Sequence, residues 1–465
     1  MQRLIAKYGL AAHLALLAVA PFFLFPFCGD CTVAAVLLWL SLIGALWMVL
    51  EPSMRTGEGL SDARRRVSRG LLLDPLTWIL LVLIVFSGVR ALNAGTALCY
   101  DAESAAWYVS AQRFPLLPGA VGDAGFLPFG VTVAFSVLLL SCRHSLGRAA
   151  RHLFLLTTSA GAGLSATIVL VALRTDWLAG LDSLLPSSDG IQCSFAGFAF
   201  GLYLAGGLVA LVAIFERNWG GALVPAILAV GGTAAGAIAF SPPYLLAAFV
   251  VAGLLTLVYA FAFAKKSLQP VEVFRMVLVG VTALVLGGLL VAVALPRGAL
   301  AERLAAFSDL KLLSEGFWKI REALSVLAFK SWISHLWLGT GVSSFPLDFR
   351  IHAQAADWVL FPRGAADVAN CWWLLLAERG VVGTMLFALP FGFLLFTYVH
   401  RLIGGIPNLG FPHPACILAP MVLGLFVAAG FFGCSPLRAE VILATGSLAA
   451  ISAASVPRAR RRGNG

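Results

Sequence analysis

Apolar runs of about 20 residues recur from one end of this chain to the other, and each is long enough to cross a bilayer as a helix. Of the 465 residues, 60% are hydrophobic and only 12% are charged, about half the charged share of an ordinary soluble protein. Runs such as residues 71–92 are apolar on all sides, unlike the alternating strands of a membrane barrel. Because a helix satisfies its own backbone groups inside lipid, the sequence predicts an all-α, polytopic membrane helical bundle.

The hydropathy pattern places about 12 transmembrane helices in a single membrane domain that covers residues 1–465. The predicted spans are 9–28, 32–50, 74–92, 125–142, 153–173, 193–215, 222–240, 244–263, 277–295, 381–399, 413–432 and 437–455. The first run follows Arg3 and Lys7 and resembles a signal peptide. A second span begins almost at once, however, which favours an uncleaved hairpin of two helices.

The formal net charge of +10 would hint at a nucleic-acid partner in a soluble protein. Here the basic residues gather in alternate short loops, as in segments 55–69, 143–151 and 265–275. The positive-inside rule explains this pattern, so both termini are predicted to be cytoplasmic. Membrane lipid, and no nucleic acid, is the partner that the composition implies.

The longest connection, residues 296–380, lies on the predicted external side between the ninth and tenth spans. Loops of this length in a compact protein are usually functional or separately folded, so the candidate site is sought here. Apolar residues at three-to-four spacing predict an amphipathic helix that lies along the membrane surface, or that only plugs the bundle. These residues are Phe317, Ile320, Leu324, Leu327 and Ala328, and the predicted polar face holds Lys319, Arg321 and Glu322.

Six of the eight cysteines fall near the predicted external face, where an oxidising compartment would allow disulfides. Their pairing stays open. The segment Cys28-Gly29-Asp30-Cys31 has the spacing of a redox motif, but it lies in a tight hairpin between two spans. A structural bridge is therefore favoured over a redox or zinc site, with two buried apolar cysteines as the alternative.

Cationic side chains also gather on the predicted external side. A guanidinium group makes two parallel charge-assisted hydrogen bonds to phosphate, so such a group at the membrane boundary suits a pyrophosphate. The candidate pyrophosphate ligands are Arg321, Lys319, Arg350, Arg379 and Arg90. For any one of them the alternative is an arginine that extends from a helix end to the interface. Arg321 could instead form an ion pair with Glu322 or Glu315.

Four segments of the loop, taken in order, resemble the bacterial O-antigen ligases and the related O-antigen polymerases. In that family the loop reads as an Arg- and Trp-rich helix, then H-P-L-L-G-x-G-x-x-x-F, then H-N, then L-L-A-E-x-G-x-x-G. The corresponding segments here are 317–324, 334–345, 369–370 and 375–383. They contain the motif residues Gly339, Gly341, Asn370 and Glu378.

The resemblance implies a glycosyltransferase embedded in the bacterial inner (cytoplasmic) membrane. Such an enzyme moves a preassembled glycan from a polyprenyl pyrophosphate carrier to a glycan or lipid acceptor on the periplasmic side, with no metal and no cofactor. Arginines would stabilise the charge that builds on the leaving pyrophosphate, and a base would assist the acceptor hydroxyl.

Two departures from the family pattern keep other functions open. The family's His before Asn is Ala369 here, and its Ser-Arg-Gly turn at a middle span reads Ser241-Pro242-Pro243. His352 and His335 are the candidate bases in the loop, although each could be an ordinary surface histidine. The alternatives are a non-catalytic member of the same fold that acts in polysaccharide assembly, and a secondary transporter. A transporter would need ionisable groups at mid-membrane, where the spans hold almost none.

Overall fold

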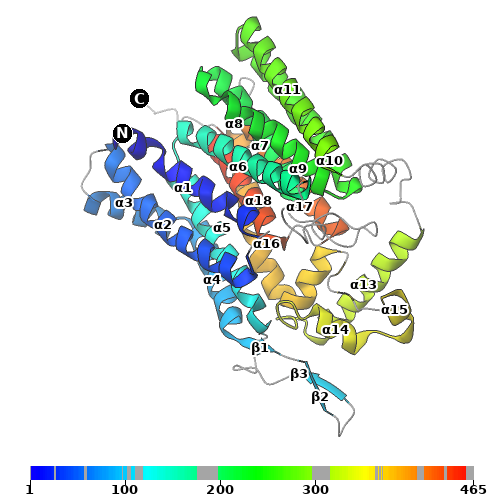
Figure 1. The fold of residues 1–465 in the computed structure, drawn as a ribbon. Coiled ribbons are helices and arrows are strands. Elements are labelled where there is room, and N and C mark those ends of the chain that lie inside the picture. Colours follow the sequence, from blue (N-terminus) through cyan, green and yellow to red (C-terminus); the bar gives the residue numbers. More distant parts are fainter. Residues whose placement is uncertain are drawn as a thin grey trace.

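The computed structural model describes residues 2–25, 28–56, 60–96, 98–101, 106–109, 119–174, 197–295, 315–361, 365, 368, 370–405, 413–433 and 437–456. Long helices form one bundle, with short helices and strands gathered at one end of it (Figure 1). The bundle consists of α1 (Gln2–Leu24), α2 (Asp30–Thr56), α3 (Leu60–Leu72), α4 (Pro75–Leu92), α5 (Phe126–His144), α6 (Arg148–Arg174), α7 (Gly197–Glu216), α8 (Leu223–Ile227), the π-helical turn η4 (Leu228–Gly232), α9 (Thr233–Phe240), α10 (Pro243–Ser267), α11 (Pro270–Ala294), α16 (Cys371–Gly405), α17 (Leu418–Phe432) and α18 (Ala439–Ser455).

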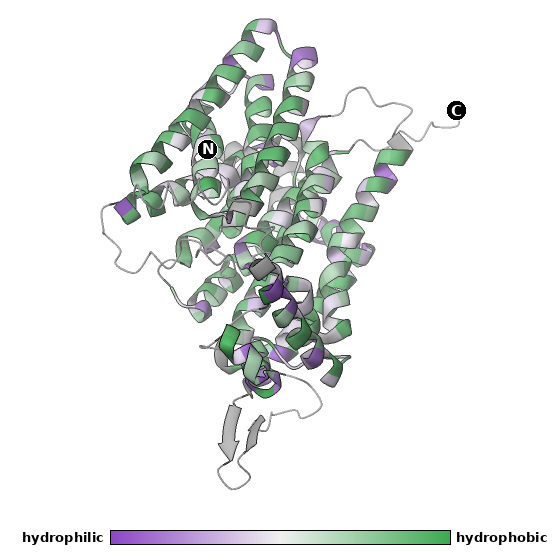
Figure 2. Ribbon diagram, turned by 90° about the vertical axis from the view of Figure 1, so that its right-hand side faces the viewer, coloured by the Kyte–Doolittle hydropathy of each residue, from purple (hydrophilic) through white to green (hydrophobic). Residues whose placement is uncertain are grey.

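The all-α, multi-pass architecture is confirmed. In the described part of the chain ten helices are long and apolar enough to cross a membrane, and two shorter apolar helices are Tyr8–Leu24 and Ala439–Ser455. Each of them overlaps one of the predicted spans. Hydrophobic residues cover the length of the helices, and hydrophilic ones gather near their ends (Figure 2).

The outer helices present bare apolar side chains, as a membrane protein requires. On α10 and α11 these include Leu255, Val258, Phe274 and Leu289, which are all more than half exposed. Nearly every residue of α7 and α18, in contrast, is buried among the other helices. Since water would not tolerate so large an apolar surface, lipid surrounds this bundle.

Glycines allow α6, the turn η4 and α11 to touch backbone to backbone. A Cβ atom on Gly163 would lie 1.8 Å from the carbonyl oxygen of Leu228, and one on Gly231 would lie 2.4 Å from that of Ala283. Small residues at such crossings let membrane helices approach closely, which is a main source of their packing energy. The π-helical turn places both of these contacts on one stretch of chain.

The long loop contributes short elements that pack on the bundle at the end called here the loop end. They are α13 (Glu315–Ser334), α14 (Phe345–His352) and α15 (Ala355–Leu360). The amphipathic helix is confirmed, since Leu324, Leu327 and Ala328 of α13 are buried against α14 and the start of α16. The end that carries the C-terminus of α18 is called the opposite end.

Four short strands, which the sequence reading did not anticipate, also lie at the loop end (Figure 1). Strand β1 (Ala94–Thr96) pairs in parallel with β4 (Ala120–Val121), and β2 (Leu98–Asp101) pairs antiparallel with β3 (Ala106–Val109). The loop joins this group through Val342, whose N–H donates to the carbonyl of Gly119 at 3.0 Å.

The favoured bridge between Cys28 and Cys31 is wrong for this structure. Both residues are free thiols, as are Cys142, Cys371 and Cys416. Asp30 begins α2 directly between the two cysteines, so Cys31 lies within a helix that has already started. The alternative of two buried cysteines is not observed either, since Cys28 is half-buried and Cys31 is exposed.

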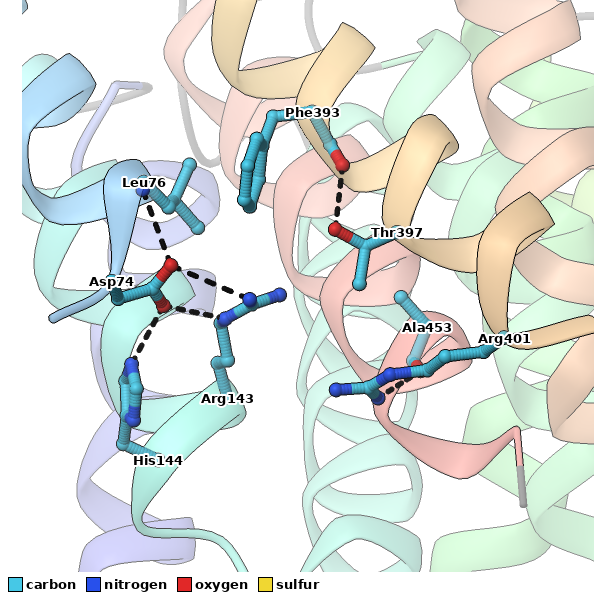
Figure 3. A network of polar contacts seen from close by, with 8 residues as sticks. All are labelled: Asp74, Leu76, Arg143, His144, Phe393, Thr397, Arg401 and Ala453. Atoms are coloured by element: carbon cyan, nitrogen blue, oxygen red, sulfur yellow. Dashed lines mark hydrogen bonds and ion pairs between the residues drawn. The ribbon is translucent and has the colours of Figure 1, made fainter. Parts of the chain in front are cut away.

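Asp74 organises the opposite end between α4 and α5 (Figure 3). Its carboxylate accepts a hydrogen bond from the backbone N–H of Leu76 and thereby caps α4. The Nε of Arg143 lies 2.6 Å, and the Nε2 of His144 lies 2.8 Å, from its Oδ2 atom. Burial raises the pKa of Asp74, but the hydrogen bond from His144 and the charge of Arg143 outweigh burial, so the pKa is lowered.

Two further arginines fix the end of α18 near this cluster. The Nη1 of Arg401 donates to the carbonyl of Ala453, and the Nη1 of Arg151 donates to that of Ala454, each at 2.6 Å. These carbonyls have no intrahelical donor because they lie in the last turn of the helix.

Replacing Asp74 with Asn should lower stability by about 1–3 kcal/mol, since it leaves the half-buried Arg143 without a carboxylate partner. Thermal unfolding in detergent at pH 7 measures this. The matched control is Asp62→Asn on α3, an exposed position that should leave the unfolding temperature unchanged. Because the folded-state pKa of Asp74 is lowered, its contribution is complete at neutral pH. It is lost as the pH falls through that lowered value, so the difference between wild type and Asp74→Asn should shrink only in strongly acidic solution. Equal unfolding temperatures for the two variants at pH 7 would contradict this.

Candidate functional site

Two glycine-containing turns, residues 334–345 and 375–383, dock on each other at the loop end. Four main-chain hydrogen bonds join them, with N···O distances between 2.9 and 3.1 Å. The pairs are Thr340 N to Ala377 O, Gly341 N to Glu378 O, Val381 N to Leu336 O and Val382 N to Trp337 O. The two segments that carry most of the family resemblance are therefore direct neighbours in the fold.

Glycine is required at the centre of this contact. Gly339 and Gly380 have φ angles of 69° and 66°, a left-handed conformation that strains other residues. A Cβ atom on Gly339 would lie 2.4 Å from the carbonyl carbon of Glu378, and one on Gly380 would lie 2.3 Å from the carbonyl oxygen of Trp337. Backbone packing alone thus accounts for the predicted motif glycines, including Gly341 with its φ of 124°.

Arg90, in the last turn of α4, fastens both turns to the bundle. Its side chain is 4% exposed. The Nη2 atom donates to the carbonyl of Leu338 and, at 3.1 Å, to the carbonyl of Glu378. Its Nη1 atom is buried and has no hydrogen-bond partner among the described residues. The structure therefore places this predicted phosphate ligand between the two turns, with one nitrogen committed to backbone carbonyls.

Asp348 of α14 secures the same region from the other side. Its Oδ2 accepts hydrogen bonds from the hydroxyls of Ser331 and Thr340, each at 2.7 Å, and from that of Ser344 at 3.4 Å. Burial raises the pKa of Asp348 above its ordinary value, although the Thr340 and Ser331 hydrogen bonds act in the opposite direction. The carboxyl group thus ties α13, the first turn and α14 together.

The prediction that Arg321 lies on the polar face of the loop helix is wrong. Arg321 is 7% exposed, whereas Lys319 and Glu322 on either side of it are exposed. Its two Nη atoms donate to the carbonyls of Phe431 and Phe432, the last two residues of α17. An apolar helix face accommodates this arginine because the carbonyls at a helix end need donors and attract positive charge.

A pocket of about 310 Å³ opens at the loop end among α2, α4, α5, α16 and α18. Its walls are mostly apolar and include Leu83, Val131, Phe135, Leu374, Phe387 and Ile442. Four polar residues also line it, namely Asp30, Thr132, Arg379 and Arg438. The combination of apolar walls with a few polar groups is typical of small-molecule sites.

Arg379 is the predicted ligand that the structure brings to this pocket. It follows Glu378 directly, so the docking of the two turns sets the point at which its side chain enters. Its guanidinium carbon lies 5.8 Å from the centre of the Phe387 ring. No residue in the described ranges accepts a hydrogen bond from it, which leaves its donors available to a bound anion. Arg438, exposed and directly before α18, is the second guanidinium group of the pocket.

The two predicted histidines lie outside the pocket. His335 is exposed, and its Nδ1 lies 3.0 Å from the hydroxyl of Ser334. His352 ends α14, one turn after Asp348. Neither side chain lines the pocket. The structure therefore separates both candidate bases from the cations that suit a phosphate.

The remaining predicted residues have local roles or lie at the surface. Asn370 caps α16, since its Oδ1 accepts a hydrogen bond from the N–H of Trp372 at 2.9 Å. Glu378 contributes its backbone carbonyl to the docked turns. Lys319 and Arg350 are exposed on α13 and α14, and Ala369 lies outside the described residues. No group of three metal-binding side chains occurs within the described ranges.

Sequence reasoning missed Asp30 as a site residue. It counted Arg438 among the cations on the external side but did not include it among the candidate pyrophosphate ligands. Asp30 lies between Cys28 and Cys31, and the spacing of these cysteines led to an interpretation in terms of disulfide chemistry. The feature of the sequence that could have identified Asp30 and Arg438 is that each lies at the external end of a predicted span. Asp30 lies just before the second predicted span and Arg438 at the start of the last one, so both lie at the membrane boundary on the same predicted side.

Gly380→Ala should disrupt the docked turns, because the new methyl group would overlap the Trp337 carbonyl and the backbone would be strained. We expect a lower unfolding temperature in detergent and faster proteolysis of the loop. Gly392→Ala is the control on the same helix, since nothing lies within 4 Å of a Cβ atom there. Unchanged unfolding and proteolysis in Gly380→Ala would refute the structural role of this contact.

Comparison of the sequence with models of protein families found no match, and comparison with curated proteins found none.

Proposed function

We propose that this protein binds a polyprenyl pyrophosphate-linked glycan at the loop end and transfers the glycan to an acceptor on the periplasmic side of the bacterial inner membrane. One observation carries this proposal: the pocket at that end combines two guanidinium groups with apolar walls that extend into the bundle. A lipid pyrophosphate has the matching chemistry, with an anionic head and an apolar tail.

The two arginines would bind the head of this lipid. Arg379 can offer paired N–H donors to the pyrophosphate oxygens, and Arg438 adds a second positive charge to the same pocket. Leu83 and Phe387, which line the same pocket from α4 and α16, would contact the first carbons of the polyprenyl chain. A volume of about 310 Å³ accommodates the pyrophosphate and the start of the chain, so the glycan and the rest of the lipid would extend beyond it.

The same arginines would favour the transfer step. The acceptor hydroxyl oxygen attacks the anomeric carbon of the glycan, and the bond from this carbon to the pyrophosphate oxygen breaks. The electron pair leaves on the lipid pyrophosphate, whose growing negative charge Arg379 and Arg438 stabilise.

Asp30 would accept the hydroxyl proton. It supplies the carboxylate in the lining, and it has no ion-pair partner among the described residues. A carboxylate next to a bound acceptor can act as a general base. This assignment replaces the two histidines of the loop, which do not reach the pocket.

Arg379→Gln and Arg438→Gln should each weaken binding of a fluorescent polyprenyl pyrophosphate roughly 10- to 150-fold, since each removes a charge-assisted contact of roughly 1.5–3 kcal/mol. Fluorescence anisotropy with the detergent-solubilised protein measures this. Arg350→Gln is the matched control, an exposed arginine at the loop end that does not line the pocket. The pyrophosphate assignment fails if Arg350→Gln weakens binding as much as the two pocket variants do.

Asp30→Asn should reduce transfer of labelled lipid-linked glycan in liposomes by roughly 10²–10⁴-fold while leaving lipid binding unchanged. Asp30→Glu should restore part of the rate, because it returns a carboxylate. Transfer by Asp30→Asn at the wild-type rate would eliminate Asp30 as the base. A wild-type protein that binds the lipid but transfers nothing would favour a non-catalytic partner in polysaccharide assembly.

A further inference from the structure

A second pocket of about 310 Å³ lies at the opposite end of the bundle, far along the helices from the proposed transfer site. It is formed where α7 ends, where the short 3₁₀ turn η3 (Gly220–Ala222) leads into α8, and where α11 begins. Its polar lining consists of Asn218, Trp219, Glu272 and Arg275. The rest of the lining is apolar.

The charged residues of this pocket are available to a ligand. Glu272 and Arg275 lie one turn apart on α11, and neither forms an ion pair within the described ranges. The partial positive charge at the N-terminus of α11 favours a carboxylate such as Glu272. It does not favour the positively charged Arg275 one turn later, so the helix dipole does not explain that residue. The pocket therefore offers one anionic and one cationic group, side by side, at the membrane boundary.

Part of the apolar lining faces the surrounding lipid. Leu223 of α8 is 50% exposed and Leu278 of α11 is 55% exposed, and both line the pocket. Trp219 lies in the turn between α7 and α8, with the guanidinium carbon of Arg217 at 5.7 Å from the centre of its ring. Tryptophan and arginine at this level are characteristic of the interface between head groups and acyl chains. A ligand can thus enter sideways from the membrane.

We propose that this pocket binds a zwitterionic phospholipid whose head group carries a primary ammonium. Its phosphate contacts Arg275, its ammonium donates hydrogen bonds to Glu272, and its acyl chains run along Leu223 and Leu278. The charge pattern selects this head group. An anionic lipid would meet the carboxylate of Glu272, and a quaternary ammonium has no N–H with which to donate.

Native mass spectrometry of the intact protein tests the proposal with phosphatidylethanolamine, phosphatidylcholine and phosphatidylglycerol of equal chain length. The wild type should bind phosphatidylethanolamine about tenfold more tightly than phosphatidylcholine. Glu272→Gln should abolish that preference, and Arg275→Gln should weaken binding of all three lipids. Glu322→Gln and Lys330→Gln, exposed on α13 at the loop end, are the controls and should change nothing.

The wild-type comparison needs no variant, so a variant that fails to fold does not prevent the test. Equal affinity for phosphatidylethanolamine and phosphatidylcholine would overturn the ammonium contact. Tightest binding of phosphatidylglycerol would show an anionic-lipid site and would also overturn the proposal. A preference that survives Glu272→Gln would place the lipid elsewhere on the protein.

Discussion

Arginine side chains supply hydrogen-bond donors to backbone carbonyls at the places where the helices of this bundle end. Arg321 caps α17, while Arg151 and Arg401 cap α18 from two different helices. Arg90 does the same for the carbonyls of the docked turns. Such carbonyls lack intrahelical donors, and lipid cannot supply any. The positions of the loop helices and the shape of the loop-end pocket depend on these contacts.

This use of arginine changes how the cations of the long loop are interpreted. Arg90 and Arg321 donate to backbone carbonyls and are nearly inaccessible, although both were predicted as phosphate ligands. Arg379 differs from them. It lies beside the docked turns and lines the pocket, and no carbonyl among the described residues accepts a hydrogen bond from it. A guanidinium group whose N–H donors already bind backbone carbonyls has few donors left for a phosphate. A guanidinium group without such bonds can form paired charge-assisted hydrogen bonds to it. The proposed lipid site rests on this distinction.

Much of the fold was predictable, and much less of the candidate site. Hydropathy located the spans, and three-to-four spacing located α13, because burial of apolar area has a period that sequence displays directly. The same spacing misplaced Arg321, since a periodicity rule assigns charged residues to the exposed face. Asp30 escaped notice for another reason. Its partners in the pocket come from α16 and α18, which are hundreds of residues away in sequence.

The sequence by itself determined that the chain is a multi-pass helical membrane protein, because apolar length and scarce charge leave no other way to satisfy the backbone. It also determined that Gly339 and Gly380 lie in turns that resemble those of O-antigen ligases. Only the tertiary structure decided that these turns dock on each other, which arginines are committed to carbonyls, and which side chains share a pocket. The physical reason is the distance along the chain over which each effect depends. The hydropathy of a span is a property of one continuous segment. A hydrogen bond to a helix end joins residues far apart in sequence, and they meet only through the packing of the whole bundle.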